Sequence, residues 1–460
     1  MFIEQFVDEG LGNSAYLVGS HESHLAALID PLRDVDRYLA AADRMGVAIS
    51  HVLDTHLHAD FITGVREVAA RSQATIGASA AAGLGFDHRP LGEGDAIALG
   101  DLTIGVLATP GHTPEHISFT LSKAGASKPA ALFSGGALMV GGAARTDLIS
   151  AERTVPLARQ LYHTIHDKLL ALPDDVDVYP THGAGSFCAA PTSSDRSTTI
   201  GRERSGNYLA QPQSEDEFVQ AALSGLPSYP TYYRELRPVN QHGPRVLGGV
   251  PALTPRSPEE VRQWIEQRGE VLDVRPPYTF VEGHIPGAYG IAVTVPLITW
   301  AGWLIPFGTP LMLVSNGPAD REEAVRQLIR IGYDDLRGYL EGGMDAWAEA
   351  ALPLDRFKSM RVAELRERMG AGEAPVILDV RQDSEWEAGH IGGAIHIENG
   401  RLPWDNLPLL KDQPIAVHCQ HGGRSVAGLS ILARRGYLDL AVVKGGFAAW
   451  EKAGFAVQRG

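Results

Sequence analysis

The chain has 460 residues, which exceeds one ordinary core and predicts two to four domains. A formal charge of −15, without clustered Lys and Arg, excludes nonspecific binding to nucleic acid, and no apolar run is long enough to cross a membrane. Only two cysteines, Cys188 and Cys419, are present, which excludes a disulfide framework and leaves two thiols to be judged by their neighbours.

The first residues, MFIEQFVDEG, are acidic where a secretory signal would be basic, so we expect a cytoplasmic protein. Short β-type runs follow, among them AYLVGS, AALIDP, HVLDTHL and LTIGVLATP. They alternate with helical stretches such as DVDRYLAAADRMG. This alternation predicts a mixed α/β fold for the N-terminal part of the chain.

Histidines follow three of the predicted strands. THLHADF places His56, His58 and Asp60 on alternate residues, so in an extended segment their side chains share one face. His112 lies in TPGHTPEH and His182 in YPTHGAG, each after another strand. Because imidazoles that converge on one point bind transition metals, this set predicts a metal site.

The order of these motifs resembles the metallo-β-lactamase fold, and within it the persulfide dioxygenases that are fused to rhodaneses. ARTDL, THGAGSFC, TTIGRERSGN and PTYYREL are further matches, and the resemblance covers most of residues 1–245. It implies an αββα sandwich in which two His and one Asp hold a mononuclear Fe(II). There O2 would oxidise a low-molecular-weight persulfide, such as glutathione persulfide, to sulfite. By motif the implied ligands are His56 and His112, with His58, Asp60 and His182 as further candidates.

Two positions depart from the family pattern. Phe61 stands where two-metal hydrolases have a second-site His, which disfavours a zinc thioester hydrolase. Gly136, in FSGGALMV, stands where the family has its Asp ligand, so the two-His-one-carboxylate set is incomplete. Either His58 supplies a third nitrogen in a more zinc-like site, or water fills the gap, or the module holds no metal and only binds a thiol or persulfide.

Two further residues are candidates for binding the substrate. Arg145, in ARTDL, matches a family position near the thiol carrier and could pair with its carboxylate; the alternative is a surface arginine. Cys188, six residues after His182, could face the same pocket; the alternative is a buried thiol.

The C-terminal half contains an internal repeat. VLDVRPPYTFVEGHIPGAYGI, from Val271, matches ILDVRQDSEWEAGHIGGAIHI, from Ile377. The repeat predicts two copies of one domain, over residues 255–355 and 360–460, after a Ser-, Pro- and Gly-rich stretch that contains one helix, EDEFVQAALSGLP. Strands alternating with helices predict an α/β domain with a parallel sheet in each copy.

In the second copy the strand PIAVH leads into Cys419 and then into a helical pattern. A cysteine on a glycine-containing loop at a helix N-terminus faces backbone N–H groups and the positive end of the helix dipole, which stabilise a thiolate or a persulfide anion. Arg424 adds a positive charge. The remaining residues of this predicted sulfur-binding loop are Gln420, His421, Gly422, Gly423 and Ser425.

This loop resembles that of the rhodaneses, which have Cys, four residues and Arg on the same turn. LDVR, GHIGGA and KGGFAAW also match, so the resemblance covers residues 360–460. It implies transfer of sulfane sulfur through a Cys419 persulfide, with Asp379 and Arg381 ordering the fold. The alternative is a buried structural cysteine followed by a glycine turn.

The first copy has Ser315 where the second has Cys419. A hydroxyl cannot carry sulfur as a persulfide, and Asp320 aligns within one place of Arg424. We therefore interpret this copy as a degenerate rhodanese that acts as a spacer or docking surface.

Combined, the parts predict one route of sulfide and persulfide metabolism. A persulfide is oxidised to sulfite at the N-terminal iron, Cys419 exchanges sulfane sulfur, and sulfite and a persulfide combine into thiosulfate. The alternative keeps only the rhodanese active and leaves the N-terminal module as a metal-poor binding domain, with Gly136 as its motivation. We expect a homo-oligomer.

Overall fold

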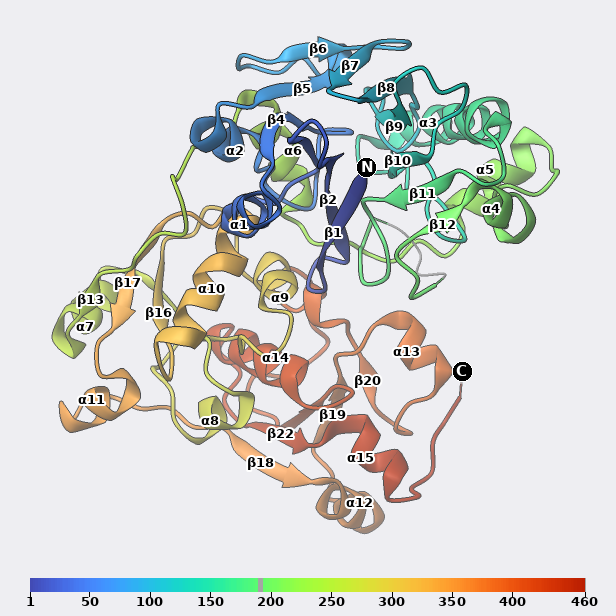
Figure 1. Ribbon diagram of the computed structural model, residues 1–460. Helices are drawn as coiled ribbons and strands as arrows, with labels where there is room; N and C mark the ends of the chain where they lie inside the picture. Colours follow the sequence, from blue (N-terminus) through green and yellow to red (C-terminus); the bar gives the residue numbers. More distant parts are fainter. Residues whose placement is uncertain (189–192, 460) are drawn as a thin grey trace. The chain divides into compact units, whose positions relative to one another are not determined.

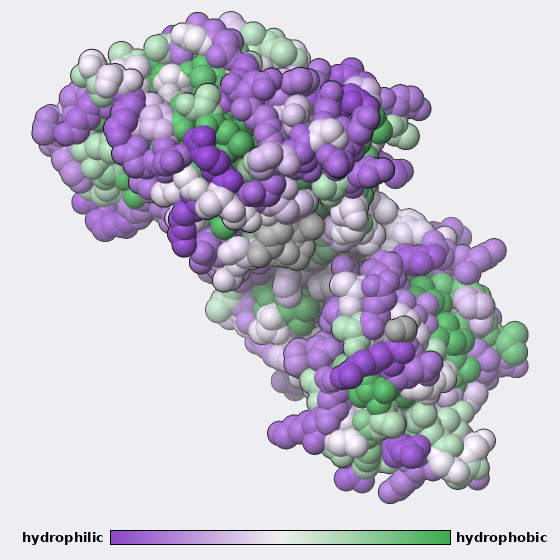
Figure 2. All heavy atoms as spheres, turned by 90° about the vertical axis from the view of Figure 1, so that its right-hand side faces the viewer, coloured by the Kyte–Doolittle hydropathy of each residue, from purple (hydrophilic) through white to green (hydrophobic). Residues whose placement is uncertain are grey.

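The computed structural model describes residues 1–188 and 193–459 (Figure 1). Its contacts divide them into two compact units, Met1–Val250 with Ile329–Gly332, and Pro251–Leu328 with Tyr333–Gly460. None of the described helices is long and apolar enough to span a membrane. On the face drawn in Figure 2, hydrophilic residues cover most of the surface and apolar residues form small patches, in keeping with the charged composition.

The first unit is built on two six-stranded mixed sheets. One has the order β1-β2-β3-β4-β5-β6 and the other β12-β11-β10-β9-β8-β7. The strands of the first sheet are β1 (Phe2–Asp8), β2 (Asn13–Ser20), β3 (Leu25–Ile29), β4 (Ala48–Leu53), β5 (Thr75–Ser79) and β6 (Arg89–Leu91). Those of the second are β7 (Ala96–Leu99), β8 (Leu102–Ala108), β9 (Ile117–Lys123), β10 (Ala131–Gly135), β11 (Asp177–Pro180) and β12 (Thr198–Thr199).

Alternating apolar residues bring the two sheets face to face. Tyr16 and Val18 of β2 belong to the same buried cluster as Ile104, Phe119 and Phe133 of the second sheet. Because successive side chains of a strand point to opposite faces, the other face of each sheet is left for helices. The N-terminal unit therefore has the predicted αββα sandwich.

Helices cover the outer faces of both sheets. Tyr38 of α1 and Val68 of α2 pack on Leu28 of the first sheet, whereas Ile200 of α4 packs on Leu132 and Val178 of the second. The helices of this unit are α1 (Asp36–Met45), α2 (Val65–Ser72), α3 (Ala151–His163), α4 (Ile200–Gly206), α5 (Glu215–Leu223) and α6 (Tyr233–His242), with short turns η1 (Ala80–Ala82), η2 (Thr164–Lys168) and η3 (Leu169–Ala171). The helices predicted from DVDRYLAAADRMG and EDEFVQAALSGLP are confirmed as α1 and α5.

The second unit contains two five-stranded sheets in which every strand pair is parallel. Their orders, β13-β17-β16-β14-β15 and β18-β22-β21-β19-β20, are the same when each copy is counted from its own first strand. The strands are β13 (Pro255–Arg256), β14 (Glu270–Asp273), β15 (Tyr289–Gly290), β16 (Leu311–Val314), β17 (Leu336–Leu340), β18 (Lys358–Arg361), β19 (Val376–Asp379), β20 (Ile395–His396), β21 (Ile415–His418) and β22 (Leu440–Lys444). This confirms the predicted fold of two successive α/β domains.

Helices flank both parallel sheets, as expected for strands joined by crossover connections. In the first copy they are α7 (Pro258–Glu266), α8 (Pro277–Glu282), α9 (Leu297–Leu304), α10 (Pro318–Arg330) and α11 (Gly343–Glu349). In the second they are α12 (Val362–Ala371), α13 (Asp383–Ala388), η4 (Asn399–Arg401), α14 (Gly423–Arg434) and α15 (Gly446–Lys452).

Candidate functional site

Cys419 lies directly after β21, on the loop that leads into the N-terminus of α14. Its Sγ accepts a hydrogen bond from the backbone N–H of Gly422 at 3.1 Å and lies 3.7 Å from Oγ of Ser425. Gly422 has a φ of 118°, a left-handed conformation that favours glycine, and it turns its N–H back toward the sulfur. The thiol is buried, so this N–H acts on the sulfur with little competition from water.

A second turn supports the loop, at the start of α15. Phe447 and Ala448 donate backbone hydrogen bonds to the carbonyls of Cys419 and Gln420, at 2.8 and 3.0 Å. A methyl group on Gly446 would lie 2.1 Å from the Cys419 carbonyl oxygen, so only glycine fits there. The sulfur loop is thereby fixed between β21, α14 and the first turn of α15.

The positive charge of Arg424, which the sequence placed near the sulfur, is paired with a carboxylate. Its guanidinium binds both carboxylate oxygens of Glu385, on α13, at 2.5 and 2.7 Å. Burial alone would raise the pKa of Glu385, but Arg424 lowers it below its ordinary value. Of the other predicted loop residues, His421 is exposed and Gln420 accepts a hydrogen bond from Arg381 at 3.4 Å.

Asp379 and Arg381 form a buried bidentate ion pair one strand away from the loop. The guanidinium also donates to the carbonyl of Gly389 at 2.7 Å. Asp273 and Arg275 make the same pair in the first copy, although that copy has no cysteine. A geometry that persists without the thiol belongs to the fold, which agrees with the role that the resemblance implied.

Ser315 follows β16 as Cys419 follows β21. The loop to the next helix is shorter, because α10 begins at Pro318, three residues after Ser315, whereas α14 begins four residues after Cys419. Proline has no N–H to offer at a helix N-terminus. Asp320 adds a negative charge in the first turn of α10, so this loop lacks the thiol, a donor and the positive charge that an anionic sulfur needs.

In the first unit, His56, His112 and His182 form a buried cluster. A nitrogen of each ring lies within 4.8 Å of the others, and the Nε2 atoms of His56 and His182 are 3.3 Å apart. These residues follow β4, β8 and β11, three strands of two different sheets. The sandwich therefore brings the three predicted histidine motifs together at one edge.

The outward nitrogen of each ring is held by a hydrogen bond. His112 Nδ1 donates to the carbonyl of Arg145 at 2.6 Å, which leaves its Nε2 free as a lone-pair donor. His56 Nδ1 lies 2.8 Å from Oγ1 of Thr55, and His182 Nδ1 lies 3.0 Å from Oδ1 of Asn13. Such outer hydrogen bonds fix the ring orientation of metal-ligating histidines.

Burial keeps two of these imidazoles neutral. It lowers the pKa of His56 well below its ordinary value, and neighbouring histidines lower it further. Burial, with a smaller electrostatic contribution from its neighbours, lowers the pKa of His112 to about 3. A neutral imidazole is the form that coordinates a metal, so the rings of His56 and His112 can bind one at neutral pH.

His58 belongs to two other groups of candidate ligands, one with Asp60 and His182 and one with Asp30 and Asp54. Its Nε2 lies 3.3 Å from Asp30 and 3.8 Å from Asp54, and its ring stacks on Phe61 at 4.1 Å. Burial would lower the pKa of His58, but the two carboxylates raise it to about 9. Among the described residues, His182 and not His58 has a ring nitrogen within 4.8 Å of those of both His56 and His112.

Asp60 lies next to the cluster, in a group of candidate ligands with His58 and His182. Its Oδ2 accepts a hydrogen bond from Asn13 at 2.6 Å and is 3.4 Å from Nδ1 of His182. Its buried Oδ1 has no hydrogen-bond partner among the described residues. A carboxylate oxygen therefore remains available within reach of the same pocket.

Gly136 follows β10 and lies against His112. A methyl group there would be 2.7 Å from Cδ2 of His112 and 2.9 Å from Cβ of Ala144, and the N–H of Gly136 donates to Nε2 of His116 at 3.0 Å. The space that the side chain of an aspartate would need at this position is therefore filled by His112 and Ala144. An aspartate at this position requires the His112 ring to move.

The donor set fits a divalent transition metal. Three buried imidazoles with fixed rings suit zinc and iron alike, and a carboxylate lies nearby in Asp60. The set differs from two histidines and one aspartate because His182 takes the third place.

Arg145 and Cys188 both lie close to this centre. The Arg145 guanidinium binds both oxygens of Asp147, at 2.6 and 2.7 Å, and donates to the carbonyls of Phe187 and Pro227. Cys188 is buried and hydrogen-bonded to Tyr233, and burial raises the pKa of its thiol well above the ordinary value. Arg145 is therefore buried, not on the surface, and it links the segments of Asp147, Phe187 and Pro227. Its predicted pairing with a substrate carboxylate stays a prediction.

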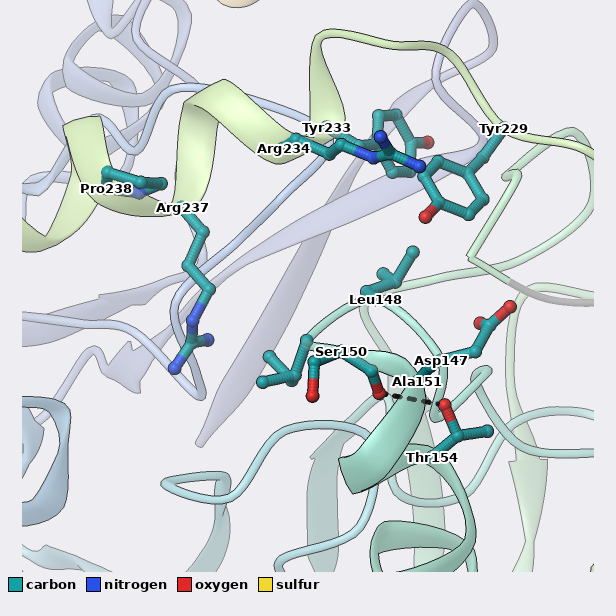
Figure 3. Close-up of a pocket in the computed structure, with 11 residues that line it drawn as sticks. Asp147, Leu148, Ser150, Ala151, Thr154, Tyr229, Tyr233, Arg234, Arg237 and Pro238 are labelled. Carbon is teal, nitrogen blue, oxygen red and sulfur yellow. Dashed lines mark hydrogen bonds between the residues drawn. The ribbon is translucent and has the colours of Figure 1, made fainter.

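A cleft of about 650 Å³ opens beside Cys188. Figure 3 shows Tyr229, Tyr233, Arg234 and Arg237 along one side, with a segment from Asp147 to Thr154 opposite. Tyr233 links the cleft to the Cys188 thiol. The guanidinium of Arg234 on this wall favours an anionic ligand.

One wall residue connects the cleft to the histidine cluster. Arg237 binds both oxygens of Glu115 at 2.9 and 2.8 Å, and Glu115 accepts the N–H of Leu57 at 3.0 Å. Leu57 stands between His56 and His58 in the chain. The ion pair therefore holds the histidine-bearing loop in place.

Sequence reasoning missed several members of this site. Asn13, Asp30, Asp54, Glu115 and His116 were not singled out. Asp30 and Asp54 end the predicted strands AALID and HVLD, so a search for polar residues at strand ends would have found them. No sequence pattern pointed to Asn13, because it reaches the histidine cluster only through the pairing of β2 with the loop that contains His182.

Models of known families match three parts of the chain. The metallo-beta-lactamase superfamily matches residues 8–182, and the rhodanese-like domain matches residues 257–350 and 361–453. The matched ranges contain His56, His112 and His182 in the first case and Cys419 in the last.

Individual proteins show the same division. The mitochondrial persulfide dioxygenase ETHE1 of Mus musculus is 33% identical over 185 residues, 39% of this chain and 68% of that protein. The thiosulfate sulfurtransferase GlpE of Pseudoalteromonas translucida is 35% identical over 97 residues, 21% of this chain and 91% of that protein. A crystal structure of a metallo-beta-lactamase from Staphylococcus aureus has a TM-score of 0.67 and 31% identity, covering 74% of this chain and 98% of that one.

Proposed function

We propose a role in persulfide metabolism for this chain, which belongs to the metallo-β-lactamase superfamily through a domain related to ETHE1 persulfide dioxygenase and carries two rhodanese domains after it. The observation that carries the proposal is that one chain contains two sites suited to persulfide chemistry. One is the histidine cluster beside a cationic cleft, and the other is the cradled Cys419 thiol.

The N-terminal site oxidises a low-molecular-weight persulfide. His56, His112 and His182 would hold iron, with Asp60 as a nearby carboxylate. When bound, iron supplies the redox chemistry by which O2 converts sulfane sulfur to sulfite. The protein contributes neutral imidazoles, a buried pocket and an anion-binding entrance.

The cleft suits a thiol carrier with carboxylates, such as glutathione. Among the described residues the Arg234 side chain has no hydrogen-bond or ion-pair partner, so its guanidinium is available to a substrate carboxylate. Arg237 is held by Glu115 and shapes the wall between the cleft and the histidines. The persulfide end would then point toward Tyr233 and the cluster.

The Cys419 site transfers sulfane sulfur. The Cys419 thiolate attacks the outer sulfur of thiosulfate, a new S–S bond forms, and the old S–S bond breaks as sulfite leaves with its electron pair. The N–H of Gly422 donates to the sulfur before the attack and is placed to stabilise the resulting persulfide. Run in the other direction, the same step joins sulfite and a persulfide into thiosulfate.

Metal analysis with oxygen uptake tests the N-terminal half of the proposal. We expect iron to be retained and oxygen uptake to depend on added glutathione persulfide. A chain that lacks both, and gains both as Gly136→Asp, would instead support a noncatalytic binding module whose carboxylate was lost. Thioester cleavage by zinc-loaded protein would support a hydrolase.

A further inference from the structure

The domain that lacks the cysteine reaches into the Cys419 loop of its neighbour. Tyr278, on α8 of the first rhodanese domain, accepts a hydrogen bond from the backbone N–H of Gly445 at 3.0 Å. Its hydroxyl also lies against Gly422, where an added methyl group would come within 2.4 Å of it. Val295, from the same domain, lies against Gly423, where a methyl group would come within 2.6 Å.

These contacts fall on the two backbone segments that hold Cys419. Gly422 donates to the Cys419 sulfur, and the turn that begins at Gly445 donates to the carbonyls of Cys419 and Gln420. A single side chain, that of Tyr278, touches both segments. Moving it would loosen the N–H that faces the sulfur together with the turn that supports the loop.

The repeat shows that this tyrosine is particular to the first domain. The corresponding residue of the second copy is Ser384, on α13, which is exposed. The first copy also has Thr279 where the second has Glu385, the partner of Arg424. Helix α8 thus lacks the residue that would serve a loop of its own domain and presents Tyr278 to the loop of the other.

Other contacts fix the two rhodanese domains against each other. Arg434 of α14 pairs with Glu270 at 2.8 Å, and the Trp303 ring packs on Gly400 so closely that a methyl group there would lie 2.1 Å from it. Helix α14, which starts at the sulfur loop, packs on both α8 and α9. The position of Tyr278 is therefore set by an interface and not by one hydrogen bond.

We propose that Tyr278 is a positioning residue of the Cys419 site, assisted by Val295, and that this is what the cysteine-less domain contributes to catalysis. The proposal rests on the sulfurtransferase activity proposed above. The Tyr278 hydroxyl holds Gly445, and its ring and oxygen confine Gly422, so that the Gly422 N–H stays directed at the sulfur while Cys419 gains and loses a sulfur atom.

The test is Tyr278→Phe in the full chain, which keeps the ring and removes the oxygen that accepts the Gly445 N–H. Loss of one such hydrogen bond in the reacting loop lowers kcat for thiosulfate-to-cyanide transfer by about tenfold, with KM changed much less. Tyr339→Phe is the matched control, because Tyr339 is a part-buried tyrosine of the same domain stacked on Arg321 at 3.7 Å, and it retains the wild-type rate.

Rates are expressed per reactive Cys419, counted by iodoacetamide labelling and intact mass. A purely structural role reduces the number of reactive sites, whereas a positioning role reduces the rate at each site. If Tyr278→Phe fails to fold, Val295→Ala carries the test, with an expected loss of about threefold in kcat per site.

The outcomes separate this inference from the proposed function. Wild-type rates per site in the variant that folds would overturn the role of Tyr278 and Val295 while leaving the sulfurtransferase intact. A wild-type chain that forms no Cys419 persulfide from thiosulfate would overturn the proposed function itself.

Discussion

At Cys419 the chemistry depends on one thiol and one backbone donor. The sulfur is buried and accepts the N–H of Gly422. This geometry was predictable from the sequence, because CQHGGRS between a strand and a helix specifies the loop locally. The pairing of Arg424 with Glu385 was not, since it joins two segments 39 residues apart.

Replacing that thiol should remove the transfer activity. Cys419→Ser is expected to lower thiosulfate-to-cyanide transfer by at least about a thousandfold, because a hydroxyl cannot form a persulfide. Cys188→Ser, which removes the other thiol, should leave this rate unchanged. Equal rates for wild type and Cys419→Ser, measured by thiocyanate formation, would contradict the assignment.

His182 distinguishes the two possible third nitrogens of the metal site. His182→Ala should lower the amount of iron retained after dialysis by about tenfold or more, because a ligand nitrogen is lost. His163→Ala changes an exposed histidine and serves as the control. Metal analysis that finds full occupancy in His182→Ala would show that His182 is not a ligand.

At the scale of elements, the residues of the histidine cluster and of the Cys419 site lie just after the ends of strands. The sequence showed histidines after three strands, but it could not show which side chains meet, because β4 belongs to one sheet and β8 and β11 belong to the other. His58 was expected to be able to supply the third nitrogen. The carboxylates at the ends of β3 and β4, Asp30 and Asp54, hold it instead.

The pair between α13 and α14 should make the stability of the second rhodanese domain depend on pH. The pKa of Glu385 is lowered in the folded state, so the pair stabilises the fold above the ordinary value of 4.5 and loses this effect as the pH falls below it. Glu385→Gln should therefore lower the thermal midpoint at pH 7, and its deficit relative to wild type should shrink as the pH falls from 4.5 towards 3.

Glu387→Gln is the control for this prediction, because Glu387 is an exposed residue of the same helix. The measurement is the thermal midpoint of wild type, Glu385→Gln and Glu387→Gln at pH 7 and at pH 3. A deficit of Glu385→Gln that persists unchanged at low pH would show that the lost charge is not the cause.

At the scale of the whole molecule, the duplication has produced two domains with one fold and different tasks. Internal repeats made the two copies and the missing cysteine evident from the sequence. The contact of Tyr278 with Gly422 and Gly445 was beyond sequence reasoning, because it depends on how the copies pack and not on either copy alone. Gly136 likewise was visible as a missing carboxylate, whereas its packing on His112 was not.

The most direct test of the account is the product formed from glutathione persulfide and O2 by the iron-loaded full chain. We expect oxygen uptake with thiosulfate as the main product, and the same uptake with sulfite as the product in Cys419→Ser, because the second site can no longer join sulfite to sulfane sulfur. Absence of oxygen uptake at full iron occupancy, or identical products from both proteins, would contradict the claim that the two sites act in one route.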